Sequence, residues 1–268
     1  MARARALALG SSRRHEPPAA CRGFRLQNET NHRPRYAGSA GVQRTLPMSP
    51  TLEIVLFWLG FAGGHLVLSS VPVRSRMVAA MGRVPYLGLY SVVAFAFFIP
   101  LVATYFAHKH AGVLLWGPGV GPLLRGVMYV GMGVAFIFVV SSLLRPSPAG
   151  VVPGSSTPSG VYRITRHPQN MGIALFGLLH LLPNGSAADL AFFGGFALFG
   201  VVGSWHQDQR KLAVGEPGFK AFLERTPFWP FSGPETLRGV RELSPLAVGV
   251  GIGLTVLVRY FHPRWFGG

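Results

Sequence analysis

Six apolar runs, separated by short polar loops, constrain this chain more than any other feature. They lie at roughly residues 52–71, 86–107, 122–144, 169–184, 187–205 and 244–261. Each is close to the ~20 residues that an α-helix needs to cross ~30 Å of hydrocarbon. With 49% hydrophobic and 13% charged residues, the chain has more apolar residues than a soluble core needs. We therefore predict an all-α, polytopic integral membrane bundle of about six transmembrane helices.

The fourth and fifth runs are both short. Pro183, Asn184 and Gly185 leave room only for a tight reversal between them. A tilted or re-entrant hairpin is therefore the alternative to two full spans here. Between the third and fourth runs the chain is rich in Pro, Gly and Ser and has no periodicity, which indicates a loop.

Residues 1–47 differ in composition from the rest of the chain. They are rich in Arg, Pro, Ser and Asn and have no sustained apolar period, so we predict a disordered basic tail. The net charge is +16, but nine arginines lie in this segment and most others in short loops, so no nucleic-acid partner is expected. The single cysteine, Cys21, also lies here, which leaves residues 48–268, the predicted transmembrane domain, without a thiolate ligand.

Lysine and arginine are concentrated in the loops that follow the first, third and fifth runs. Because such loops stay inside, we expect this side to be cytoplasmic. The arginine-rich tail would then have to cross the membrane, against the same rule. The alternative is that translation starts at Met48 and that residues 1–47 are not part of the protein.

Two histidines, His65 and His180, lie at membrane depth in the first and fourth runs. Ionisable groups in a span are functional candidates by default. Gly63 and Gly64 leave room beside His65 for a flat ligand or a close helix. Helical rise places the two imidazoles within about 10 Å of each other in depth. Helical spacing therefore allows a site in which both histidines bind one ligand. The alternative, which spacing alone does not exclude, is that each imidazole makes an ordinary interhelical hydrogen bond.

Three cationic or titratable residues, Arg163, Arg166 and His167, precede Pro168, which is typical of the first turn of a helix. Amides and the dipole at a helix N-terminus favour negative charge. These residues are candidates for binding an anionic group. Anchoring at the cytoplasmic membrane surface is the alternative.

Four segments of the chain are distinctive: GHLVLSSVPVRSRMVAAMGRVPYLGLYS, GVYRITRHPQNMG, LLHLLPNG and SWHQDQRKLAVGEPGFKAFLERTPFWPF. Together they resemble the NnrU family of bacterial membrane proteins. The resemblance covers nearly everything after Met48 and implies a multi-pass protein of the bacterial inner (cytoplasmic) membrane. Within that superfamily the chain is also similar to the 15-cis-zeta-carotene isomerases, through ITRHPQ, the histidine of LLHLL, YFAHKHAGVLLWGPGVG and YFHP, in the same order.

The isomerase resemblance implies a heme b held by His65 and His180, whose reduced iron drives cis-to-trans rotation in a conjugated polyene. His108 and His167 match two other family histidines without an assigned role at the iron. The plant enzymes have a cysteine where this chain has Gly177, so ligand exchange through that thiol is not expected. The implied partners are the lipid bilayer and a hydrophobic polyene, and the oligomeric state is left open.

Two alternatives follow from the same residues. The NnrU resemblance implies a link to nitrite and nitric oxide reduction, which would suit a non-catalytic or heme-binding role. The more distant resemblance is to isoprenylcysteine and phospholipid methyltransferases, which share the helix start YRxxRHPxxxG. Their acidic pair is replaced here by His206, Gln207 and Asp208, so methyl transfer ranks below isomerisation.

Overall fold

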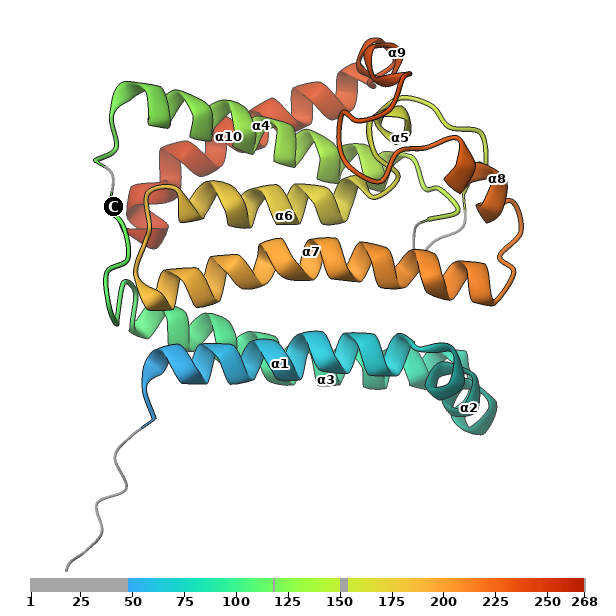
Figure 1. Cartoon of the computed structure of the whole chain (residues 1–268), viewed down its shortest axis with the longest axis horizontal. Helices are drawn as coiled ribbons and strands as arrows, with labels where there is room; N and C mark the ends of the chain where they lie inside the picture. Colours follow the sequence, from blue (N-terminus) through green and yellow to red (C-terminus); the bar gives the residue numbers. More distant parts are fainter. Residues whose placement is uncertain (1–47, 118, 150–153, 268) are drawn as a thin grey trace, which may run out of the picture. The chain divides into compact units, whose positions relative to one another are not determined.

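The computed structural model describes residues 48–117, 119–149 and 154–267. The predicted tail, residues 1–47, lies outside the described residues. The helices are α1 (Pro50–Ser69), α2 (Val71–Met81), α3 (Arg83–Ala107), α4 (Pro122–Leu144), α5 (Val161–Ile164), α6 (Pro168–Leu181), α7 (Ala187–Ala213), α8 (Phe219–Glu224), α9 (Thr236–Arg241) and α10 (Pro245–Phe266) (Figure 1). The described part of the chain forms no strand, which confirms the all-α prediction.

Five of these helices are long and apolar enough to cross a membrane: α1, α3, α4, α7 and α10. The protein is therefore a multi-pass membrane protein. The fourth predicted run folds as α6, whose 14 residues cover about 21 Å and fall short of a full bilayer crossing. The fifth run is longer than predicted, because α7 continues through the polar residues after 205 and ends at Ala213.

Helix α7 is central to the packing of residues 48–267. It packs against α6 on one side and against α1 on the other. Helix α3 packs on α1, whereas α4 packs on both α6 and α10. The α6–α7 pair therefore separates α1 and α3 from α4 and α10 (Figure 1).

Two glycines let α6 and α7 approach closely. A Cβ atom at Gly177 would collide with the backbone oxygen of Phe193, and one at Gly200 would collide with that of Asn170. Small residues at such contacts are the usual device for tight helix packing in membranes. The close approach fixes the residues at both ends of α6 relative to α7.

Aromatic residues fill the space between α1, α3 and α7. Trp58 lies at the centre of this cluster, and its indole Nε1 donates a hydrogen bond to the Phe192 backbone oxygen at 3.1 Å. The outward faces of the spanning helices are also apolar, as at Leu59, Val130 and Leu198, which are 64%, 71% and 67% exposed. An apolar surface of this extent suits contact with lipid.

Candidate functional site

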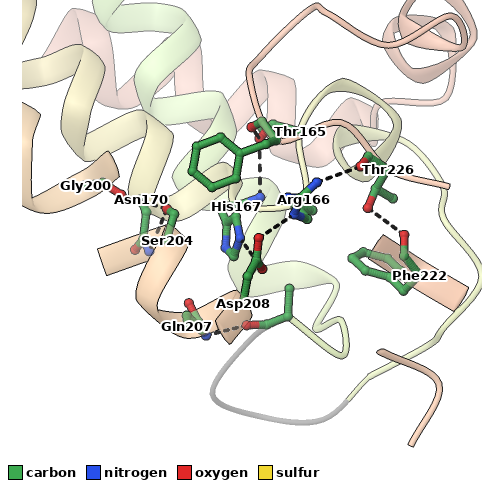
Figure 2. Close-up of polar contacts among 12 residues, drawn as sticks. Thr165, Arg166, His167, Asn170, Gly200, Ser204, Gln207, Asp208, Phe222 and Thr226 are labelled. Atoms are coloured by element: carbon green, nitrogen blue, oxygen red, sulfur yellow. Dashed lines mark hydrogen bonds and ion pairs between the residues drawn. The ribbon is translucent and has the colours of Figure 1, made fainter. Parts of the chain in front are cut away.

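A buried carboxylate, Asp208 on α7, anchors the start of α6. Its side chain is 4% exposed. Arg166 Nε donates to Oδ2 at 2.8 Å, and His167 Nε2 lies 2.8 Å from Oδ1 (Figure 2). Arg166 also donates to the Thr226 backbone oxygen at 2.9 Å. We refer to Asp208, Arg166, His167 and Thr226 as the Asp208 network.

Local structure explains why Arg166 and His167 reach this carboxylate. Helix α5 ends at Ile164, Thr165 is extended, and Pro168 starts α6. Thr165 Oγ1 donates to the Phe228 backbone oxygen at 2.7 Å, which holds the turn against the segment after α8. The chain between α5 and α6 is therefore fixed, with two consecutive side chains directed at α7 (Figure 2).

Arg163, on α5, has carboxylate partners of its own. Its Nε donates to Glu242 Oε2 at 2.8 Å, and its guanidinium also pairs with Glu235. Glu242 Oε2 also accepts the Gly160 N–H at 3.0 Å. This backbone hydrogen bond and the Arg163 guanidinium lower the pKa of Glu242 to about 2.

All three predicted anion-binding residues, Arg163, Arg166 and His167, therefore have a carboxylate of the chain as partner. An external anion would have to displace Asp208 or Glu242, and such a site stays a prediction. Sequence reasoning missed these pairings. The signal for Asp208 was that it is the one carboxylate at the position where the sequence motif was expected to carry an acidic pair.

His65 lies on α1 in an aromatic environment. Its Nδ1 is 2.9 Å from the Phe61 backbone oxygen. The ring centroid lies 4.3 Å from that of Phe61, 4.9 Å from Tyr90 and 5.2 Å from Phe199. The Nδ1 hydrogen bond selects the tautomer that leaves Nε2 for a ligand, which is the usual state of a metal-binding histidine.

His180 lies near the end of α6 and has the same local hydrogen bond. Its Nδ1 is 2.9 Å from the Phe176 backbone oxygen, so Nε2 is again left for a ligand. The ring stacks on Phe193 of α7, with centroids 4.9 Å apart and planes 21° apart. The ring of His262 on α10 lies at a centroid distance of 6.5 Å from that of His180.

Among the described residues, the ring contacts of His65 and His180 do not include each other. Their contacts on α7, Phe199 and Phe193, are six residues apart, about 9 Å of helical rise. The ring of Phe196, also on α7, contacts both Trp58 of α1 and Phe176 of α6.

Each of the two imidazoles has donor chemistry that suits a heme iron, because its Nδ1 is held by a backbone oxygen. Residues 48–267, where described, contain no group of three or more His, Cys, Asp or Glu side chains that could hold a metal ion. Heme coordination by His65 and His180 stays a prediction.

A second buried carboxylate, Asp189, lies at the opposite end of α7 and was not singled out from the sequence. Its side chain is 1% exposed. Oδ1 accepts the Tyr105 hydroxyl at 2.8 Å, and Oδ2 accepts the Ser186 N–H at 3.1 Å. His110 Nδ1 lies 3.0 Å from Oδ2. We refer to Asp189, Tyr105, His110 and Ser186 as the Asp189 network.

Fold and site together define a multi-pass helical membrane protein with two histidines inside the bundle and a buried carboxylate network at each end of α7. The family model described as NnrU protein matches residues 53–268. The chain belongs to the NnrU family.

Two curated relatives are similar over most of the chain. The 15-cis-zeta-carotene isomerase, chloroplastic, of Zea mays is 23% identical over 200 residues, which cover 73% of this chain and 54% of the relative. The protein of the same name from Arabidopsis thaliana is 24% identical over 187 residues, covering 69% and 50%. The chain thus spans about half the length of the curated relatives it matches. No solved structure matches it.

Proposed function

We propose that this protein is a cis–trans isomerase that acts on a lipid-soluble polyene of the zeta-carotene type. The observation that carries the proposal is the similarity to two 15-cis-zeta-carotene isomerases over about 200 residues. That length includes most of the helix bundle, so the likeness concerns the membrane-embedded part of the chain and not a single motif.

The surroundings of His65 suit a substrate of this chemistry. Sites for apolar ligands are lined mainly by hydrophobic and aromatic side chains with a few polar groups. Phe61, Phe199 and Tyr90 surround the His65 imidazole. A Cβ atom at Gly63, two residues before His65, would meet no other heavy atom within 4 Å, so the surface of α1 is open at this depth. A polyene dissolved in the bilayer could contact α1 at the level of His65.

Heme b belongs to this proposal as the cofactor that the isomerase resemblance implies. When bound, it would supply a redox-active iron. We place His65 at the polyene because of its aromatic neighbours, and its coordination of iron together with His180 stays a prediction. Its fixed Nδ1 hydrogen bond to Phe61 orients the imidazole towards a bound chain.

Methyl transfer is a weaker candidate on structural grounds. Asp208 is the one carboxylate left where the methyltransferases carry an acidic pair. Both of its oxygens are engaged, by Arg166 and His167. Arg166 already neutralises the charge of Asp208, so this carboxylate would bind a sulfonium cofactor only weakly.

The test is expression of the full chain in a bacterial host that accumulates zeta-carotene with a cis 15 double bond, grown in the dark to avoid photoisomerisation. We expect chromatography to show loss of the 15-cis isomer relative to the host with an empty vector. His65→Phe keeps the aromatic bulk and removes the imidazole, and we expect it to lower conversion at equal membrane content. Unchanged isomer ratios with the wild-type chain present in the membrane would contradict the proposal and favour a non-catalytic role.

A further inference from the structure

We propose that a cavity at the C-terminal end of α7 binds the headgroup of a phospholipid that carries both a phosphate and an ammonium group. This inference goes beyond the proposed function, because the ligand is a membrane lipid and not the polyene. The same pair of charges occurs in free phosphoethanolamine, so the test has to distinguish a lipid from a soluble phosphate ester.

The cavity lies where the chain passes from α7 to α8. It has a volume of about 590 Å³. Two lysines, Lys211 and Lys220, and two glutamates, Glu216 and Glu224, contribute to its lining. Gly215 also lines it and has a φ of 62°, the left-handed conformation that lets the chain turn away at the end of a helix. The turn between the two helices is therefore lined by charges of both signs.

Lys211 is the buried cation of this cavity. The residue is 4% exposed, and its Nζ lies 6.0 Å from the centre of the fully buried Phe219 ring. In the part of the chain that the structure describes, Lys211 Nζ makes no ion pair and no hydrogen bond. Burial of an unpaired ammonium costs free energy, which an anionic ligand would offset. Lys211 therefore indicates an anion in the cavity.

Neighbouring charges also favour an anion beside Lys211. Arg210 and Arg74 are near enough to repel its ammonium, whereas Glu216 attracts it. Neither arginine forms an ion pair with a carboxylate among the described residues. This region thus has more positive charge than the described part of the chain neutralises, and a phosphate would balance it.

The depth of the cavity suits a lipid headgroup. Helix α7 has 27 residues and is about 40 Å long. The hydrocarbon core is only ~30 Å thick, so part of α7 has to lie in the headgroup layer. That part is its C-terminal end, where residues 206–211 are all polar. Lys211 is therefore placed at the level of the lipid phosphates.

The two glutamates favour a headgroup with a second, positive charge. A phosphate without an ammonium would be repelled by Glu216 and Glu224. In a zwitterionic headgroup the phosphate pairs with Lys211 and Lys220, while the ammonium donates to the carboxylates. Charge complementarity therefore favours phosphatidylethanolamine over phosphatidylglycerol, whose net charge is negative.

The test is lipid binding by the purified full chain in detergent, measured by native mass spectrometry. We expect saturable binding of phosphatidylethanolamine, weaker binding of phosphatidylglycerol and no binding of diacylglycerol, which lacks the phosphate. Lys211→Met keeps the apolar length, removes the ammonium and should weaken phosphatidylethanolamine binding by about tenfold or more. Lys211→Arg should retain most of the affinity. Equal binding of diacylglycerol, or unchanged affinity in Lys211→Met, would overturn the proposal.

The matched control is Lys109→Met. Lys109 is an exposed lysine outside this cavity, where it donates to the Phe266 backbone oxygen, and its replacement should leave lipid affinity unchanged. Thermal unfolding of the lipid-free variants separates binding from folding. Because Lys211 has no carboxylate in ion-pair contact among the described residues, we expect Lys211→Met to be at least as stable as the wild type. A large loss of stability would show that the ammonium serves folding and would contradict a ligand site.

Glu216→Gln tests the second charge of the headgroup. It should reduce the preference for phosphatidylethanolamine over phosphatidylglycerol, and an unchanged preference would contradict recognition of the ammonium. Titration with free phosphoethanolamine distinguishes the two sources. Binding much weaker than that of the lipid supports a phospholipid. Binding as tight as that of the lipid, and lost in Lys211→Met, would keep the site but assign it to a soluble phosphate ester.

Discussion

The two ends of α7 each bury one aspartate, and the partners of these aspartates differ in kind. Asp208 is bound by a guanidinium and an imidazole from consecutive residues, Arg166 and His167. Asp189 is bound by the Tyr105 hydroxyl, by a backbone N–H and by the largely exposed His110. The same residue type thus joins the helices through an ion pair at one end and through mainly neutral donors at the other.

This difference determines what each carboxylate stabilises. A buried ion pair adds little stability compared with an apolar contact of the same size. Removing one partner, however, leaves an uncompensated charge. Loss of Asp208 would leave the Arg166 guanidinium, 13% exposed, without a carboxylate. Loss of a neutral donor to Asp189 leaves only one hydrogen bond unmade. We therefore expect the Asp208 network to be the more sensitive of the two.

The largest effect is expected for Asp208→Ala. It leaves the largely buried Arg166 without its carboxylate, and removal of one member of a buried pair costs about 3–5 kcal/mol. Thermal unfolding in detergent should show a large loss of stability. Glu224→Ala, an exposed carboxylate on α8, is the control and should have almost no effect. Equal stability of the two variants would show that the ion pair does not hold α6 to α7.

A smaller effect is expected for Tyr105→Phe. The ring stacks on Phe192 with centroids 3.9 Å apart, and phenylalanine preserves this contact. Only the hydroxyl donor to Asp189 Oδ1 is lost, at a cost of about 1–2 kcal/mol. The same unfolding measurement checks it, with Tyr260→Phe as the control because that ring is 66% exposed. A loss of stability as large as that caused by Asp208→Ala would contradict the distinction between charged and neutral partners.

The smallest effect concerns pH and Glu242. Its folded pKa is lowered to about 2 from the ordinary 4.5 by the Gly160 N–H and Arg163. A lowered folded pKa adds stability that is present above pH 4.5 and lost as pH falls towards 2. The unfolding temperature of the wild type should therefore fall over this window.

Glu242→Gln isolates this contribution, since its stability should depend less on pH between 4.5 and 2. At pH 7 we expect it to be slightly less stable than the wild type, because the carboxylate is partly exposed and screened by solvent. Parallel pH curves for the two proteins would show that the Arg163 pair does not contribute.

The sequence alone determined the helical membrane fold, the start of α6 at Pro168 and the family. Length and hydropathy were enough to predict α1, α3, α4 and α10, because a run of ~20 apolar residues is typical of a membrane-spanning helix. The full length of α7 was missed, because polar residues after 205 are held in the helix by contacts such as that of Asp208 with Arg166.

Only the tertiary structure decided which side chains meet. Spacing along a helix gives depth and face but does not say which helix lies alongside. Phe196 of α7 thus contacts both Trp58 of α1 and Phe176 of α6, and α10 brings His262 near His180, although no local pattern predicts these contacts. The partners of Arg163 and Arg166 were hidden for the same reason. Glu242 and Asp208 are distant in sequence and become neighbours only when the bundle closes.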